Sequence, residues 1–316
     1  MERYAPSSME LASRDVISRA MAQEMLAGNG CGEKKDHLHL RLEHLDAELI
    51  DNHLPTIKEI VRTFARIDIH TQPIPILPAV HFTMGGIPTN ARSQVICVNG
   101  KIIQNLLAIG ETACTSVHGA NRLGCNALLE LVVFGKSAGE LAADYATSGN
   151  SHKKITSSML EFPLSRFDRI RKSVGNTPPN KIRRELQNIM QQHGSIFRNH
   201  HLLAEGVQKL TKLWQVMKND MQVVDNSLIW NNDLLDALET ENLLSLAIAT
   251  LSSALNRTES RGAHFRADFP KRNDDDWLAH SLVTVDGNGN GSFSTSPVRF
   301  ENNSTISSFP PEERVN

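Results

Sequence analysis

The stretch from Gly110 to Gly124 places an acid, a histidine, an arginine and three glycines directly ahead of an apolar run, Asn126 to Tyr145, that has helical spacing. Glycine lets the backbone approach a ligand closely, and the amides that open a helix offer a site for an anion. Arg122 adds a planar guanidinium whose geometry matches a carboxylate. This order of residues predicts a turn, followed by a helix, where a flat or anionic cofactor meets an acidic substrate.

Composition excludes several classes of protein. The 316 residues include 33 Lys and Arg against 35 Asp and Glu, so charge does not support a nucleic-acid partner. The four cysteines are scattered without C-x-x-C spacing, so we expect no disulfide framework, no metal and no iron–sulfur cluster on this chain, and reduced thiols in an interior compartment. The apolar runs are too short to cross a bilayer, and the N-terminus does not follow the pattern of a signal or transit peptide.

The pattern of apolar and turn residues predicts a mixed α+β / α/β fold. A capping-box pattern at residues 7–10 begins a helix that runs to about Leu26, and residues 73–78 are extended because alternating prolines exclude helix. Three long amphipathic patterns beyond Pro179 predict a three-helix bundle. The other expected elements are a helical region at 45–67, a hairpin around residues 99–100, a short buried strand at 106–109 and a hairpin joined by residues 286–291.

Several features that resemble ligand sites have simpler explanations. The Gly-rich residues 28–32 and 287–291 do not stand between a strand and a helix, so ordinary turns explain them better than phosphate loops. His193, His200 and His201 have no acidic or thiolate companions at ligand spacing. We therefore interpret these histidines as a solvated helix face rather than a metal site.

Three further polar positions leave alternatives open. His81 precedes the turn at Gly85 and Gly86, where it either donates to a ligand carboxylate or is a buried structural histidine. Arg14 stands near a helix start and is either a surface charge or part of a site. The polar cluster at residues 259–266 follows a helix and lines either an interface or a site.

Six strings of the sequence are long or unusual enough to be compared with known families. They are residues 1–6 (MERYAP), 11–16 (LASRDV), 84–90 (MGGIPTN), 118–124 (HGANRLG), 259–264 (ESRGAH) and 277–280 (WLAH). Together they resemble the succinate dehydrogenase, fumarate reductase and L-aspartate oxidase flavoprotein family, and they run along nearly the whole chain. Threonine after MGGIP, and Leu-Gly after the asparagine–arginine pair, look most like the succinate dehydrogenase members.

The resemblance implies oxidation of succinate to fumarate with hydride transfer to FAD. Arg14 matches the family's catalytic proton-transfer arginine, and His81 and Arg122 match ligands of the substrate carboxylates. The remaining matched positions concern FAD: Glu111 matches the acid that binds its ribose, and Ala127 and Leu128 match backbone positions at a helix start beside the isoalloxazine. A helix dipole there would stabilise negative charge on the flavin.

The chain also departs from the family. Residues 125–128 are Cys-Asn-Ala-Leu where the family has Gly, Ala or Ser followed by Asn-Ser-Leu, Phe82 stands where tyrosine is usual, and the last residue is Asn316 rather than tyrosine. The family's Gly-x-Gly-x-x-Gly fingerprint and its flavin-linking histidine have no counterpart. We therefore expect a C-terminal portion of such a flavoprotein, with most of the FAD site on a segment outside this sequence.

The resemblance implies four parts and a set of partners. We expect a partial capping domain at residues 1–80, the C-terminal part of the FAD-binding domain at 81–150, a helical bundle domain at 151–255 and a C-terminal domain at 256–316. The implied partners are an iron–sulfur subunit and, indirectly, membrane-anchor subunits, on the matrix side of the mitochondrial inner membrane or the cytoplasmic side of a bacterial membrane. Two alternatives stay open: a truncated non-catalytic paralogue that acts as an interaction piece, and fumarate reductase or L-aspartate oxidase activity.

Overall fold

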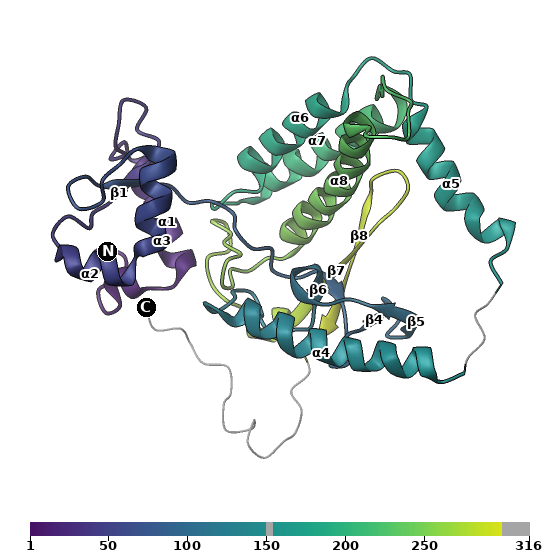
Figure 1. Cartoon of the computed structure of the whole chain (residues 1–316), viewed down its shortest axis with the longest axis horizontal. Coiled ribbons are helices and arrows are strands. Elements are labelled where there is room, and N and C mark those ends of the chain that lie inside the picture. The colour runs from purple at the N-terminus through teal and green to yellow at the C-terminus, as the bar shows by residue number, and fades with distance from the viewer. Residues whose placement is uncertain (150–153, 299–316) are drawn as a thin grey trace. The chain divides into compact units, whose positions relative to one another are not determined.

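The computed structural model describes residues 1–149 and 154–298, which form two compact units (Figure 1). The first unit is Met1–Phe82, and the second begins at Thr83. Each unit has its own buried apolar residues, so each is considered by itself.

The first unit is built around short elements. A 3₁₀ turn at Met9–Leu11 precedes helix α1, Arg14–Leu26, and the strands β1, Leu38–Leu40, and β2, Ile74–Ile76, pair antiparallel. Two small apolar clusters hold these elements, one around Ala5, Ala12 and Val16 and the other around Ile50, Ile69 and Ile74. The other helices are α2, Ala47–His53, α3, Pro55–Ile60, and a π-helical turn, Val61–Ala65.

The predicted start of the first helix is wrong, whereas its end is confirmed. Ser8 makes no side-chain capping bond, and Ala12 is extended at φ −56° and ψ 156°, so the chain leaves the 3₁₀ turn before α1 begins at Arg14. The extended residues around the prolines are confirmed as β2, which pairs with β1.

Small strands and one long helix open the second unit. The strands β3, Ile87–Pro88, and β6, Ala113–Cys114, pair in parallel, and β4, Gln94–Ile96, forms a hairpin with β5, Ile102–Leu107. Gly100 turns this hairpin at φ +77°, as the sequence predicts. The prediction of a buried strand at 106–109 is wrong, because β5 ends at Leu107 and its apolar side chains are largely exposed. Helix α4, Asn126–Thr147, follows the Gly-rich segment as expected.

A helical bundle forms the largest core of the second unit. Helices α6, Pro179–His193, α7, His200–Asn219, and α8, Asn232–Asn256, pack side by side, which confirms the three-helix prediction (Figure 1). Helix α5, Ser157–Arg171, was not predicted; it contains Pro163 and contacts α8. The fully buried core side chains include Ile170, Ile182, Leu203, Leu210, Met217, Leu244, Ile248 and Leu251.

One of the three histidines interpreted as a solvated helix face is not solvated. His193 is buried; its Nδ1 lies 3.0 Å from the Leu202 carbonyl and its Nε2 lies 3.1 Å from Lys209 Nζ. Both other histidines, His200 and His201, are exposed, as predicted. His193 lies on the buried face of α6, where backbone and lysine groups satisfy both ring nitrogens.

The described chain ends in a hairpin that packs on α8. After α9, Asp274–Trp277, the strands β7, Ala279–Val285, and β8, Gly291–Pro297, pair antiparallel over seven residue pairs. Asp286 closes the turn by accepting backbone N–H bonds from Asn288 and Asn290, both at 2.8 Å. The Gly-rich residues 287–291 are therefore a hairpin turn, as expected.

Candidate functional site

Arg14 and His81 come together within the first unit, although they are 67 residues apart in sequence. Arg14 is the first residue of α1, and its Nη1 lies 3.3 Å from His81 Nε2; both side chains are exposed. Since a guanidinium can only donate, His81 accepts through Nε2 and its neutral form carries the ring proton on Nδ1. His81 is therefore exposed rather than a buried structural histidine, and it keeps an N–H for another acceptor.

The helix start beneath Arg14 is stabilised by a buried acid. Asp15 Oδ2 accepts from Arg19 Nη2 at 2.7 Å, and Asp15 Oδ1 accepts from the Ser13 hydroxyl at 2.6 Å. An acid in the first turn interacts favourably with the N-terminal end of the helix dipole. These bonds stabilise the first turn of α1, which carries Arg14.

Glu111 lies in a tight turn of the second unit. Gly110 adopts φ +68°, and a Cβ on it would lie 2.5 Å from Leu131 Cδ2. Glu111 is exposed, and its Oε1 accepts from the Thr83 backbone N–H at 2.7 Å. A Cβ on Gly86 would meet the Thr112 carbonyl at 2.5 Å, so the backbones of the two turns approach closely. The result is a glycine-lined turn that presents a carboxylate able to accept from ligand hydroxyls.

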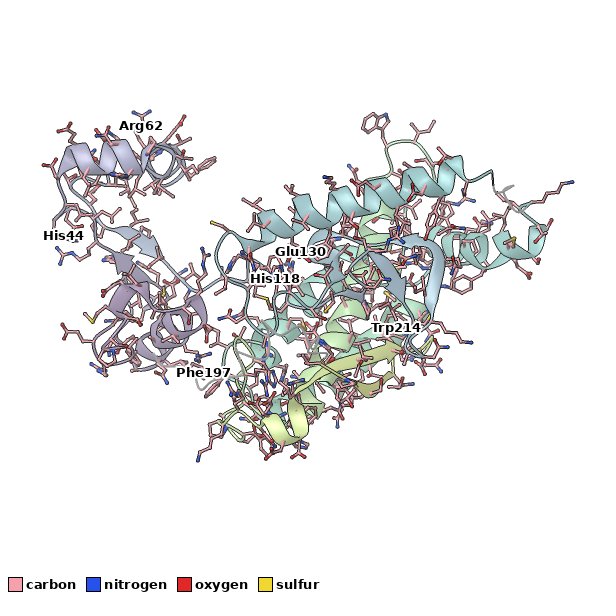
Figure 2. All side chains as sticks on the ribbon, turned by 90° about the horizontal axis from the view of Figure 1, so that it is seen from below. His44, Arg62, His118, Glu130, Phe197 and Trp214 are labelled. Carbon is pink, nitrogen blue, oxygen red and sulfur yellow. The ribbon has the colours of Figure 1, made fainter. Side chains whose placement is uncertain are left out.

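A buried carboxylate on α4 holds the segment that carries Arg122. Glu130 is 4% exposed; its Oε1 accepts from the Thr115 hydroxyl at 3.0 Å and its Oε2 lies 2.5 Å from His118 Nε2. Figure 2 shows His118 and Glu130 close to one another at the N-terminal part of α4. Sequence reasoning missed Glu130, although the signal was present as a single acid within the apolar run 128–134.

The start of α4 leaves backbone amides without a side-chain cap. Cys125, at the N-cap position, adopts φ +63° and makes no side-chain capping bond to the helix. Ala127 is half-buried and Leu128 is exposed in the first turn. The Asn126 N–H donates to the Leu123 carbonyl at 3.3 Å and the Leu128 N–H to the Cys125 carbonyl at 3.1 Å. What this end offers to an anion or to an electronegative ring edge is therefore chiefly the positive end of the helix dipole.

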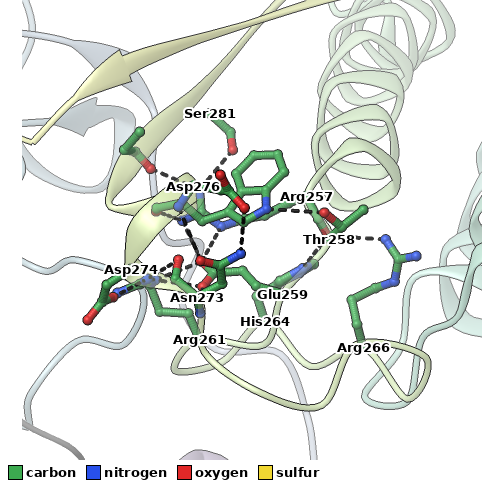
Figure 3. Close-up of polar contacts among 12 residues, drawn as sticks. Arg257, Thr258, Glu259, Arg261, His264, Arg266, Asn273, Asp274, Asp276 and Ser281 are labelled. Atoms are coloured by element: carbon green, nitrogen blue, oxygen red, sulfur yellow. Dashed lines mark hydrogen bonds and ion pairs between the residues drawn. The ribbon is translucent and has the colours of Figure 1, made fainter.

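The polar cluster at residues 259–266 is a buried ion network (Figure 3). Glu259 is fully buried and accepts from Arg257 Nη2 at 2.6 Å, Arg261 Nε at 2.7 Å and the Asn273 backbone N–H at 2.8 Å. Burial alone would raise the pKa of Glu259, but these hydrogen bonds outweigh it and hold the pKa below its usual range. Asp274 Oδ1 adds a second acceptor for Arg261 at 2.6 Å. Charges buried this deeply are stable only when paired in this way.

Two further contacts connect this cluster and β7 to the Gly110–Gly124 segment. The Ala263 N–H donates to the Ala120 carbonyl at 3.0 Å, and His280 Nε2 lies 3.2 Å from the Ser116 hydroxyl. Of the two roles that the sequence left open for residues 259–266, the structure shows an internal interface. That interface supports the loop next to Arg122.

Two half-buried histidines near this interface have pKa values below the usual range. Burial, followed by the positive charge of Arg198, lowers the pKa of His264 to about 4. Burial and the charge of Arg257 also lower the pKa of His280. Both rings therefore act at neutral pH as uncharged hydrogen-bonding groups.

Comparisons with known proteins agree with this arrangement. Residues 1–128 match the FAD binding domain model, and residues 183–316 match the fumarate reductase flavoprotein C-terminal model. The chain is 48% identical to the succinate dehydrogenase flavoprotein subunit of Rickettsia bellii, covering 100% of this chain and 54% of that protein. It is 44% identical to the mitochondrial succinate dehydrogenase [ubiquinone] flavoprotein subunit of Oryza sativa subsp. japonica, covering 100% of this chain and 50% of that one. The chain belongs to the succinate dehydrogenase/fumarate reductase flavoprotein family.

Solved structures of this family share the fold. The chain superposes on E. coli quinol fumarate reductase with a TM-score of 0.86 and 34% identity, covering 97% of this chain and 51% of that chain. The predicted mixed fold and the predicted family are thereby confirmed. The chain spans about half the length of the curated relatives it matches, and it carries part of an FAD-binding domain.

The cofactor and membrane expectations can be compared with the described residues. The FAD binding domain match confirms FAD as the cofactor class, and the turn at Glu111 and the uncapped start of α4 fit part of such a group. The relatives include mitochondrial and bacterial proteins. Within residues 1–149 and 154–298, no helix is both long and apolar enough to span a bilayer.

Proposed function

We propose that this chain is part of a flavoprotein that oxidises succinate to fumarate. The observation that carries the proposal is the exposed pair of Arg14 and His81, in which Arg14 Nη1 lies 3.3 Å from His81 Nε2, so that a positive charge stands beside a ring whose Nδ1 can donate. Relatives named as succinate dehydrogenases are 40–48% identical, whereas the fumarate reductase subunit of Haemophilus influenzae is 36% identical. This difference supports the oxidative direction over fumarate reduction.

The substrate is a dianion, and the chain supplies groups suited to its carboxylates. His81 would donate from Nδ1, because its Nε2 accepts from Arg14. Arg122, whose Nη1 donates to the Leu123 carbonyl at 3.3 Å, would bind a carboxylate through its planar guanidinium. Charge-assisted hydrogen bonds of this kind are shorter and stronger than neutral ones, so they orient the substrate as well as bind it.

Arg14 is proposed as a station for the proton that leaves the substrate. A guanidinium is a poor base because it stays protonated throughout the physiological pH range. Arg14 can take part only if its Nη1 passes a proton to His81 Nε2, which lies 3.3 Å away, so that the guanidine can accept the proton that leaves the substrate. The exposed pair would then hold the proton until it passes on.

FAD, when bound, supplies the acceptor of the hydride. Glu111 would hold its ribose, because an exposed carboxylate on a glycine turn can accept from both sugar hydroxyls. The backbone at Ala127 and Leu128 would lie beside the ring, where the positive end of the α4 dipole would stabilise negative charge; the Leu128 N–H itself donates to the Cys125 carbonyl at 3.1 Å. The loss of the serine usual in the family at residue 127 removes a hydroxyl but leaves the backbone amide.

The proposed flavoprotein has four domains and further subunits as partners. We propose that residues 1–80 are part of the capping domain, 81–150 part of the FAD-binding domain, 151–255 the helical bundle and 256–316 the C-terminal domain. An iron–sulfur subunit would accept electrons, and membrane-anchor subunits would attach the complex to the mitochondrial inner membrane or to a bacterial cytoplasmic membrane.

The test uses the chain together with the segment of the Rickettsia bellii relative that lies outside the alignment. Co-expression should give a yellow protein that reduces a dye with succinate, and Arg14→Gln should abolish turnover while FAD stays bound. The isolated chain should bind no stable flavin. A colourless complemented protein would favour the non-catalytic interaction piece, and dye-dependent fumarate reduction without succinate oxidation would favour the reductase alternative.

A further inference from the structure

Arg122 lies in a loop that other parts of the second unit hold in place. Asn121 N–H donates to the His118 carbonyl at 3.3 Å, which makes a tight turn directly before Arg122. On the near side of that turn, the side chains of Thr115 and His118 both point to the carboxylate of Glu130. The loop is therefore anchored through one buried acid of α4.

The geometry of this anchor uses both oxygens of the carboxylate. The side chains of Glu130 and His118 are 2% and 11% exposed, so neither is replaced easily by water. Thr115 donates to one oxygen at 3.0 Å and His118 Nε2 donates to the other at 2.5 Å. Charge-assisted bonds in a buried position are strong, and losing one partner leaves a buried polar group unsatisfied.

We propose that Glu130 is a positioning residue for Arg122. The proposal rests on the proposed function, in which Arg122 binds a substrate carboxylate. Glu130 holds Thr115 and His118, these two residues hold the turn at residues 118–121, and the turn sets the direction in which Arg122 leaves the loop. Glu130 itself touches no substrate.

The second unit offers a matched control for this anchor. Glu241 of α8 is also 4% exposed and is also held by side chains of its own unit, Arg166 Nε at 2.6 Å and Arg169 Nη2 of α5, with Lys218 Nζ at 3.8 Å. Glu130→Gln and Glu241→Gln therefore make the same chemical change in equally buried carboxylates. Only the first of these carboxylates anchors the Arg122 loop.

The first measurement is steady-state kinetics of the FAD-loaded, complemented protein. A glutamine at 130 presents an amide N–H₂ to one of two donors, so it loosens the loop. We expect Glu130→Gln to raise the KM for succinate about tenfold with a much smaller change in kcat, because a binding group is misplaced. Glu241→Gln should leave KM unchanged. An unchanged KM in Glu130→Gln overturns the proposal.

Rescue by a conservative variant separates positioning from general damage. In His118→Gln the side-chain amide can still donate to Glu130 Oε2, so the KM should stay within about threefold of the wild type; in His118→Leu the donor is lost and the KM should rise as in Glu130→Gln. Equal KM values for the two His118 variants contradict the anchor.

Hydrogen exchange adds a readout that needs neither FAD nor turnover. In Glu130→Gln, the amides of residues 115–122 should exchange at least about tenfold faster while those of α5 and α8 are unchanged. Glu241→Gln should show the reverse, because Glu241 of α8 pairs with Arg166 and Arg169 of α5. Protection of residues 115–122 that is the same in Glu130→Gln and wild type overturns the proposal. Arg122→Gln tests the proposed function separately. If the KM of Arg122→Gln for succinate is normal, Arg122 does not bind the substrate and that part of the proposed function is wrong. If its KM is raised while that of Glu130→Gln is normal, only the positioning role of Glu130 is refuted.

Discussion

Gly262 tests the contact between the buried ion network and the segment that carries Arg122. It adopts φ +57°, and a Cβ at this position would lie 2.6 Å from the Ala120 carbonyl oxygen and 2.9 Å from Asn121 Cβ. The neighbouring Ala263 N–H donates to that same carbonyl at 3.0 Å. Gly262→Ala must therefore push the two backbones apart.

The expected cost has two parts. A left-handed backbone costs a non-glycine residue about 1–2 kcal/mol. Separating the backbones adds the loss of the Ala263 hydrogen bond, about 0.5–1.5 kcal/mol, and further loss of packing. We expect Gly262→Ala to lower the free energy of unfolding of the second unit by about 2–4 kcal/mol.

Gly119 supplies the matched control. It adopts φ +55°, but a Cβ on it would meet nothing within 4 Å, so Gly119→Ala carries only the backbone cost. Urea denaturation followed by tryptophan fluorescence measures both variants, because all three tryptophans (Trp214, Trp230 and Trp277) lie in the second unit. Equal destabilisation by the two variants would refute the close approach of the backbones.

Two other predictions concern stability. The pKa of His264 is about 4 in the fold against 6.5 as its ordinary value, so the unfolded chain binds the extra proton between these pH values. The contribution of His264 to the free energy of unfolding is fully present above pH 6.5, and the free energy should fall by roughly 1 kcal/mol per pH unit as the pH drops from 6 to 5. His264→Gln should reduce this slope but not abolish it, because the pKa of His280 is also lowered. An unchanged slope in the variant would contradict this prediction. In α8, Leu244→Ala should lower the free energy of unfolding by about 2–5 kcal/mol and Leu246→Ala by less than about 0.5 kcal/mol. The reason is that the Leu244 side chain is 0% exposed and that of Leu246 is 64% exposed. Equal shifts of the two urea midpoints would show that burial does not decide the cost.

The elements that the sequence predicts well are those whose pattern is local. The bundle helices carry apolar residues at helical spacing, and the hairpins carry Asn-Gly or Asp-Gly turns, so neither depends on distant contacts. Helix α5 was missed because Pro163 lies inside it, and the strand at 106–109 was taken as buried because its residues are apolar. Apolar composition does not say how much of a strand is covered by other elements. Within the described residues β4 is the only strand paired with β5, and the contact with α4 leaves most of its apolar side chains exposed.

In the candidate site, too, residues that lie close together in the sequence were predicted, whereas contacts between distant residues were not. Glycines, an acid and an arginine in one short segment indicated a ligand site, and the family strings named Arg14, His81, Glu111 and Arg122 without a structure. Periodicity could not show that Arg14 and His81 meet, because 67 residues separate them and no spacing rule connects them.

Glu130 shows what a sequence reading of an apolar helix leaves out. An acid between leucines costs stability in a buried helix unless it is paired, so its presence in the run 128–134 indicates partners elsewhere in the chain. The partners are Thr115 and His118, which lie on the segment that the glycines and Arg122 had already marked. A single acid that breaks an apolar helix is therefore evidence about the loop packed against it, and here that loop carries the arginine proposed to bind substrate.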